Sequence, residues 1–214
     1  NKMFQPLKDT LPELIRGINK SKEYHWDLSP ESQHNLCSKL LDEFGRDKDL
    51  VVVGKSPHPF SITLGPNDYR ITTRIVEGEP LSSFLATAHE WGHSIYEQGL
   101  PSQSHQWFAW PLGQATSMGI HESQSLFWEN RIVKSKSFSK RFFKKFVSAG
   151  CSLNNYLELW KSINHLEAGL NRVEADELTY GLHILVRTEL EIDLIEGGLP
   201  AEDIPEEWNK RYGE

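Results

Sequence analysis

A short β-rich block between two helical stretches constrains the fold of this 214-residue chain more than any other feature of the sequence. Within residues 50–76, segments rich in Val, Ile and Thr alternate with turns such as Gly65-Pro66-Asn67-Asp68. This pattern predicts a small antiparallel sheet. Its three strands are expected at Leu50–Val53, Phe60–Leu64 and Tyr69–Val76. The chain after Pro80 has the texture of helices, so the sequence predicts a mainly α fold with one small sheet.

Helical periodicity flanks this block on both sides. Apolar residues between Phe4 and Ile18 recur at three- and four-residue steps, which predicts a first helix. Ser29-Pro30 supplies a hydroxyl cap and a proline for the start of a second helix, and Gly45 is a natural stop. The last long helix is predicted from about Asn171 to Glu196, which corresponds to roughly 40 Å at ~1.5 Å per residue.

Composition narrows the class of protein. The chain has 23 Lys and Arg against 30 Asp and Glu, a formal charge of −7, which argues against nucleic acid as a partner. Its longest apolar runs are far too short to cross a bilayer, so no membrane association is expected. Cys37 and Cys151 show no CxxC spacing, which favours a reducing cytoplasm. Without repeats or linkers, we expect residues 1–214 to form a single domain segment.

The five residues His89-Glu90-Trp91-Gly92-His93 lie in a predicted helix from Leu81 to Gln98. Histidines four residues apart share one helical face, so two neutral imidazoles can bind one divalent cation. Glu90 projects about 100° around the helix from His89, beside such a cation. The cation would lower the pKa of its bound water, and Glu90 would take the proton as that water attacks a peptide carbonyl. The alternative is a surface helix with two histidines bonded to neighbours.

A third metal ligand has to come from another position. Glu122 lies on the next predicted helix, Gln114–Lys134, where a site with two histidines and one glutamate takes its carboxylate. His105, in a loop, is a weaker candidate, and Glu97 follows His93 on the same helix, which is unfavourable geometry. Glu129 is two turns beyond Glu122 and is expected to support the ligands or the fold. The small Gly92 allows another element to approach the first helix closely.

Several motifs together resemble those of the M32 family of metallocarboxypeptidases, the thermostable carboxypeptidase Taq type. The resemblance covers nearly the whole chain and is far more specific than the two histidines alone. The motifs are His58-Pro59-Phe60, Asp68-Tyr69-Arg70-Ile71-Thr72-Thr73-Arg74, His89-Glu90-Trp91-Gly92-His93, His121-Glu122-Ser123-Gln124-Ser125 and Arg172-Val173-Glu174-Ala175-Asp176-Glu177.

The resemblance implies a helical zincin-like (neurolysin-like) catalytic domain and a carboxypeptidase that releases single residues from peptides with a free C-terminus. It implies that His89, His93 and Glu122 bind one divalent metal ion and that Glu90 is the general base and acid. Arg172 would hold the terminal carboxylate, a role for which a planar guanidinium is well suited. A homodimer is also implied. Imidazole and carboxylate ligands accept Zn²⁺, the expected ion, but also Co²⁺ and Mn²⁺.

Further residues are assigned to substrate or supporting roles, each with a structural alternative. His58 is expected to donate to substrate or to shape the turn before Pro59. Arg70 and Arg74 alternate on one predicted strand, so they would either line the cleft together or form structural ion pairs. Arg172 itself could instead be a surface residue at a helix start. The residues expected to support the ligands or to face the same cleft are Asp176, Glu177, Glu129, Tyr180 and His183.

The chain also departs from the family pattern. Asn171 stands where the family has Ile or Val, and Trp91 replaces a small residue, so this indole must pack into a neighbour or narrow the cleft. Family members are roughly twice as long and carry a GxxQDxHW motif that this sequence lacks. We therefore expect a central catalytic segment truncated at both ends. Two other functions stay open: an oligopeptidase of the helical zincin type that cuts internally, and a catalytically silent helical fragment that binds metal.

Overall fold

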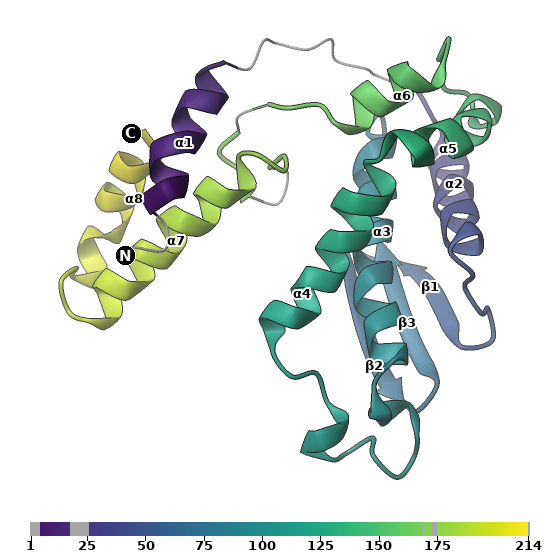
Figure 1. Cartoon of the computed structure of the whole chain (residues 1–214), viewed down its shortest axis with the longest axis horizontal. Coiled ribbons are helices and arrows are strands. Elements are labelled where there is room, and N and C mark those ends of the chain that lie inside the picture. The colour runs from purple at the N-terminus through teal and green to yellow at the C-terminus, as the bar shows by residue number, and fades with distance from the viewer. Residues whose placement is uncertain (1–4, 18–25, 168, 173–174, 214) are drawn as a thin grey trace. The chain divides into compact units, whose positions relative to one another are not determined.

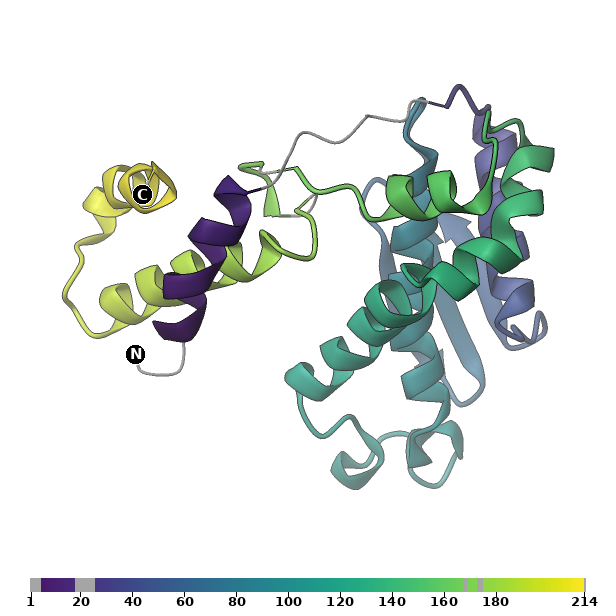
Figure 2. The same cartoon turned by 45° about the horizontal axis from the view of Figure 1, so that its top comes forward.

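A computed structural model describes residues 5–17, 26–167, 169–172 and 175–213. These residues fall into two compact units, residues 24–163 and residues 1–23 with 164–214, which we call the larger and the smaller unit. The chain is mainly α with one small sheet (Figures 1 and 2). No helix in the described part of the chain is both long and apolar enough to cross a membrane.

The larger unit contains the sheet and helices α2 to α6. Its strands are β1 (Val51–Lys55), β2 (Phe60–Gly65) and β3 (Asp68–Thr73). The helices are α2 (Pro30–Glu43), α3 (Pro80–Gln98), α4 (Met118–Leu126), α5 (Lys136–Ala149) and α6 (Tyr156–Ile163), with short 3₁₀ turns at Pro101–Gln103 and Pro111–Gly113. A π-helical segment, η3 (Phe127–Val133), directly continues α4. The predicted helix Gln114–Lys134 is therefore shorter and changes its hydrogen-bond pattern midway.

The sheet has the order β1-β3-β2 and is mixed, which corrects the predicted antiparallel arrangement. β3 pairs in parallel with β1 and antiparallel with β2. The predicted extension of the third strand to Val76 is also wrong, because the chain leaves the sheet after Thr73. The carbonyl of Val76 instead accepts a hydrogen bond from Gln33 Nε2 on α2 at 2.9 Å.

Helix α3 runs along one face of the sheet and contacts both β2 and β3 (Figure 1). Its core-facing residues Phe84, Ala88 and Trp91 are at most 1% exposed. Phe84 and Ala88 pack with the phenylalanines of α5. Trp91 packs with Leu41 and the sheet, beside Trp128, so the indole fills the core and does not narrow a cleft. Helix α5 is also tied to α2, because Arg141 and Lys145 both pair with Glu43.

Local signals explain where α2 begins. The side chain of Ser29 accepts a hydrogen bond from the amide of Ser32 at 3.2 Å, and Pro30 opens the helix, as predicted. Gly45 follows the helix with a φ of 85°. Both cysteines are buried and free, Cys37 on α2 and Cys151 after α5.

The smaller unit contains α1 (Gln5–Arg16), α7 (Tyr180–Ile195), a 3₁₀ turn (Ala201–Asp203) and α8 (Ile204–Gly213). Lys8 of α1 pairs with Glu189 of α7 at 2.6 Å. The predicted start of the last long helix at Asn171 is wrong, and the 16 residues of α7 span only about 24 Å. Asp176 Oδ1 accepts hydrogen bonds from the amides of Leu178 and Thr179 at 2.8 and 2.9 Å, which holds this segment in a turn before the helix.

Candidate metal centre

The two histidines of α3 lie one helical turn apart on the same face of the helix, next to the face that packs into the core. The ring centroids of His89 and His93 are 4.9 Å apart, and both side chains are partly buried. Because this spacing follows from the helical repeat alone, the local sequence is sufficient to bring the two imidazoles together.

Close approach of α4 brings a carboxylate to these histidines. A Cβ built on Gly92 would lie 2.5 Å from Ser125 Cα and 2.7 Å from the carbonyl oxygen of Gln124. No side chain fits there, so the two helix backbones are in direct contact at Gly92. This confirms that the glycine permits another element to approach. Glu122, three residues before Ser125, then faces α3.

Glu122 Oε2 lies 3.7 Å from His89 Nε2 and 3.4 Å from His93 Nε2. One ligand atom from each residue lies within 4.8 Å of the others, and no other such group occurs among the residues that the structure describes. Ligands of a tetrahedral zinc ion lie about 3.4 Å from one another when each is ~2.0–2.1 Å from the metal. The two Glu122 distances and the donor set of two imidazoles and one carboxylate therefore fit a site for a divalent metal ion.

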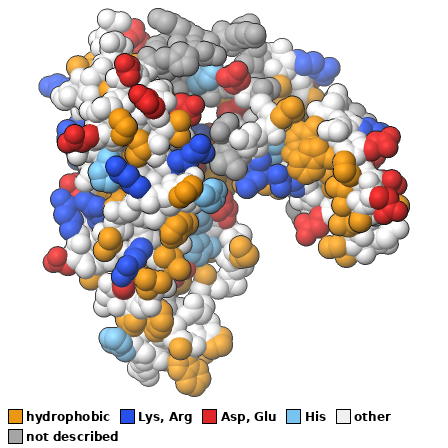
Figure 3. Space-filling model, turned by 180° about the vertical axis from the view of Figure 1, so that it is seen from behind, with side chains coloured by type: hydrophobic (Ala, Val, Ile, Leu, Met, Phe, Trp, Pro, Cys, Tyr) orange, Lys and Arg blue, Asp and Glu red, His pale blue; other side chains and the backbone are white. Residues whose placement is uncertain are grey.

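The electrostatics of Glu122 agree with its place between the imidazoles. The neighbouring imidazoles, His93 first, hold the pKa of this carboxyl below its usual range, and partial burial opposes them. Pale-blue histidine and red acidic side chains lie next to one another on the surface of the larger unit (Figure 3). A carboxylate kept ionised beside imidazoles is the form that a divalent cation requires.

A second carboxylate contacts the other ring nitrogen of His89. Glu129 Oε2 lies 2.9 Å from His89 Nδ1. Glu129 belongs to the π-helical segment η3, and the wider turn of a π-helix shifts side chains relative to a regular α-helix. Burial lowers the pKa of His89, but the hydrogen bond and charge of Glu129, with the charges of Glu122 and Glu90, raise it overall.

His93 has a different partner, which the sequence analysis did not identify. His121 Nδ1 lies 2.6 Å from His93 Nδ1, and His121 Nε2 lies 2.7 Å from Glu97 Oε1. Two sequence signals point to this arrangement. Glu97 follows His93 by one helical turn, and His121 directly precedes Glu122.

Glu90 lies beside the cluster without belonging to it. Its side chain comes from the same helix, and the residue is only 8% exposed. Burial raises the pKa of the Glu90 carboxyl, and the negative charge of Glu122 adds to this, while the charges of His89 and His93 oppose it. A raised carboxyl pKa is the usual property of a residue that both accepts and donates protons near neutral pH.

The candidate substrate residues of the larger unit are exposed. His58 lies in the turn between β1 and β2, and a positive charge on its ring lowers the pKa of Glu90. Arg70 pairs with Asp68 at 2.9 Å. Arg74 lies one residue beyond the end of β3, so the argument that alternation on one strand directs it the same way as Arg70 does not hold. His105 is exposed and outside the ligand cluster.

Five other candidates belong to the smaller unit: Arg172, Asp176, Glu177, Tyr180 and His183. Their roles toward the metal centre stay predictions. Arg172 Nη1 donates to the Tyr180 hydroxyl at 3.3 Å. The buried ring of His183 joins the Tyr212 hydroxyl at 2.9 Å to the carbonyl of Gly169 at 3.0 Å. Within its unit, His183 therefore connects α7 to α8.

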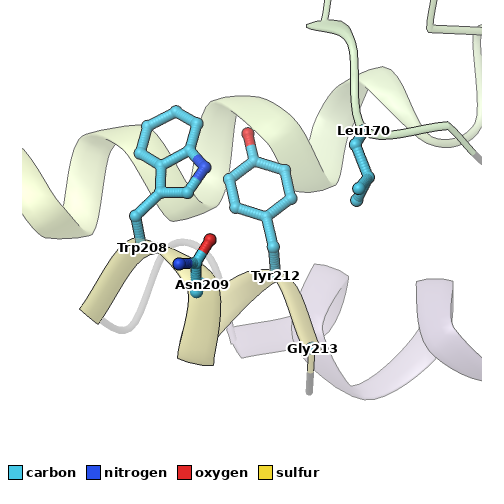
Figure 4. Close-up of a pocket in the computed structure, with 5 residues that line it drawn as sticks. All are labelled: Leu170, Trp208, Asn209, Tyr212 and Gly213. Atoms are coloured by element: carbon cyan, nitrogen blue, oxygen red, sulfur yellow. The ribbon is translucent and has the colours of Figure 1, made fainter. Parts of the chain in front are cut away.

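A shallow pocket in the smaller unit is distinct from the ligand cluster. Figure 4 shows the ring of Trp208 beside that of Tyr212, and their centroids are 4.7 Å apart. None of the candidate metal ligands lines this pocket, whose walls are Leu170, Trp208, Asn209, Tyr212 and Gly213. This pocket is therefore separate from the candidate metal centre.

Comparison with known proteins agrees with a metal centre in this chain. A family-wide sequence profile of carboxypeptidase Taq (M32) metallopeptidases matches residues 1–214. The thermostable carboxypeptidase 1 of Thermus thermophilus is 41% identical over 218 residues, which cover 98% of this chain and 42% of that protein. Carboxypeptidase 1 of Bacillus subtilis is 35% identical over 99% of this chain and 44% of that protein.

Solved structures give the same result. The metallocarboxypeptidase 1 of Trypanosoma cruzi superposes with a TM-score of 0.86 at 32% identity, over 98% of this chain and 45% of that one. The M32 carboxypeptidase of Deinococcus radiodurans gives 0.86 at 30% identity, over 99% of this chain and 44% of that one. This chain thus spans less than half the length of these relatives, and across that span it belongs to the carboxypeptidase Taq (M32) family of metallopeptidases.

Proposed function

We propose that this chain carries the metal centre and the acid–base residue of a metallocarboxypeptidase that releases single amino acids from the C-termini of peptides. The observation that supports this most directly is the convergence of His89, His93 and Glu122 from two helices, with Glu90 beside them. The three residues would hold one divalent ion, and Zn²⁺ suits the donor set best, with Co²⁺ and Mn²⁺ as alternatives.

When bound, such an ion supplies Lewis acidity that polarises a peptide carbonyl and lowers the pKa of water to about 7. Glu90 accepts the proton of the attacking water and donates it to the leaving amine, and its burial favours both tasks. Arg172 binds the free α-carboxylate of the substrate through its planar guanidinium. His58 donates a hydrogen bond to the substrate from the exposed turn between β1 and β2.

Substitution of Glu90 by glutamine tests the proposal, because glutamine keeps the size of the side chain and removes its basicity. The zinc-loaded variant should retain its metal and lose activity on a short peptide by about 10²–10⁴-fold. The exposed Glu77, changed in the same way, is the matched control and should leave activity unchanged. Unchanged release of C-terminal residues by the Glu90→Gln variant would exclude this role for Glu90.

An amidated peptide separates the proposed activity from internal cleavage. A carboxypeptidase needs the free carboxylate, so amidation should abolish release of the last residue. Retained cleavage of the amidated peptide would support an oligopeptidase instead. One bound zinc per chain with no cleavage of either peptide would identify a silent metal-binding segment.

A further inference from the structure

Three side chains form a hydrogen-bonded row that ends on one candidate ligand. Glu97 Oε1 lies 2.7 Å from His121 Nε2, and His121 Nδ1 lies 2.6 Å from His93 Nδ1. The side chains of Glu97, His121 and His93 are 19%, 24% and 16% exposed, so the row is largely shielded from water. It connects the end of α3 to the residue that directly precedes Glu122 on α4.

Hydrogen-bond chemistry determines the direction of this row when the two imidazoles are neutral. An ionised carboxylate only accepts, so His121 must donate to Glu97 from Nε2. A neutral imidazole has one donor, which leaves His121 Nδ1 as an acceptor. His93 Nδ1 must then carry the hydrogen, and its Nε2 keeps a free lone pair. That nitrogen faces Glu122 Oε2 at 3.4 Å, where the ligand atoms converge.

His89 reaches the same tautomer by a shorter route. Its Nδ1 contacts Glu129 Oε2 directly at 2.9 Å, and its Nε2 faces Glu122. Both imidazoles of α3 thus direct Nε2 toward Glu122. The Nδ1 atom of His89 is held by a carboxylate, and that of His93 by another histidine. The ring of His121 is held in place from a second side, because Tyr96 meets it edge-on with centroids 5.2 Å apart.

We propose that Glu97 and His121 are positioning residues for His93, selecting the tautomer in which its Nε2 binds the metal ion. This inference rests on the proposed metal centre. Residues that orient metal-bound imidazoles contribute strongly to metal affinity, and their loss typically lowers it about 10–100-fold. Because His121 and Glu122 are adjacent, one turn of α4 supplies both a metal ligand and the partner of another ligand.

The test combines two measurements on the full chain. Nitrogen-15 NMR of histidine rings in the metal-free protein reports which nitrogen of His93 and His89 is protonated. Competition with a chelator gives the zinc affinity. His121→Phe removes the acceptor and should lower zinc affinity about 10–100-fold while changing the His93 signals and not those of His89. His121→Asn retains an acceptor near the Nδ1 position and should recover part of the affinity.

Glu97→Leu and Glu129→Leu form a matched pair, because leucine cannot accept the hydrogen bond from the imidazole. The first should disturb the tautomer of His93 alone, and the second that of His89 alone. A purely structural role would lower the melting temperature without this selectivity. If His121→Phe does not fold, Glu97→Leu and His121→Asn provide the same two measurements.

The outcomes separate this inference from the proposed function. Wild-type zinc affinity and an unchanged His93 tautomer in the Glu97 and His121 variants overturn the inference and leave the metal centre intact. Protonation of His93 on Nε2 in the wild-type protein also overturns it. If the wild-type protein binds no zinc and Glu122→Gln behaves identically, both the metal centre and the inference fail.

Discussion

Replacing Gly92 by alanine tests whether the contact between α3 and α4 sets the geometry of the metal centre. The added Cβ would lie 2.5 Å from Ser125 Cα, whereas ordinary contact begins at 3.4 Å. The two backbones would have to separate by about 0.9 Å along this line, because the obstructing atoms belong to the backbone and cannot rotate away. Overpacking of this kind destabilises a protein by about 1–3 kcal/mol.

The effect on metal binding should exceed the effect on folding. Gly92 lies between the two histidines, and Glu122 lies one turn before Ser125, so the displacement falls within the ligand set. Metal–ligand distances tolerate changes of only about 0.2 Å, far less than the required shift. We therefore expect Gly92→Ala to bind zinc at least 10-fold more weakly than the wild-type protein.

Chelator competition measures the affinity, and urea unfolding of the metal-free protein measures the stability. Gly119→Ala is the matched control on α4, since its Cβ would meet only Ser117 Oγ at 3.9 Å. This control should bind zinc normally and be neutral or stabilised by about 0.4–1 kcal/mol. Wild-type affinity and stability in Gly92→Ala would refute the argument that direct backbone contact positions Glu122.

The remaining predictions concern stability, pH and reactivity. Chelation of the metal should lower the melting temperature, because a ligand at 100 times its Kd stabilises the folded state by about 2.7 kcal/mol, and added zinc should restore it. Glu43→Gln should destabilise the protein at pH 7, because hydrogen bonds from Lys145 and Arg141 lower the pKa of Glu43. Cys37 and Cys151 should react with a thiol reagent only after unfolding, because burial raises both pKa values, that of Cys151 to about 12. His183→Ala should destabilise the smaller unit by about 1–3 kcal/mol, measured by urea unfolding.

The pH dependence for Glu43 has a definite sign. A carboxyl whose folded-state pKa is lowered contributes stability above its ordinary pKa of 4.5 and loses it as the pH falls through the lowered value. The difference between wild type and Glu43→Gln should therefore vanish in acid, and a constant difference would contradict the ion pair. For the thiols, about one part in ten thousand of Cys151 is ionised at pH 8, so rapid labelling of the folded protein would contradict its burial. An unchanged melting temperature on chelation would count against a bound metal ion. A His183→Ala variant as stable as the wild type would count against the hydrogen bonds of His183.

Patterns confined to a few residues predicted the helices well. The Ser29 cap and the one-turn spacing of His89 and His93 depend only on neighbours in the sequence, and both are present in the structure. The mixed sheet could not be predicted in this way. β1 and β3 are parallel neighbours in the sheet, although β2 lies between them in the sequence. The late start of α7 also escaped periodicity, since Leu178 continues the apolar stripe although the Asp176 side chain holds its amide in a turn.

By itself, the sequence determined that two imidazoles share one face of α3 with Glu90 beside them, because the helical repeat fixes the angle between neighbouring side chains. Only the tertiary structure decided which groups meet that face. Glu122, Glu129 and His121 come from α4 and η3, which approach α3 because Gly92 has no side chain. Such contacts join residues about 30 to 40 positions apart, and their distances depend on how the helices pack rather than on any local pattern.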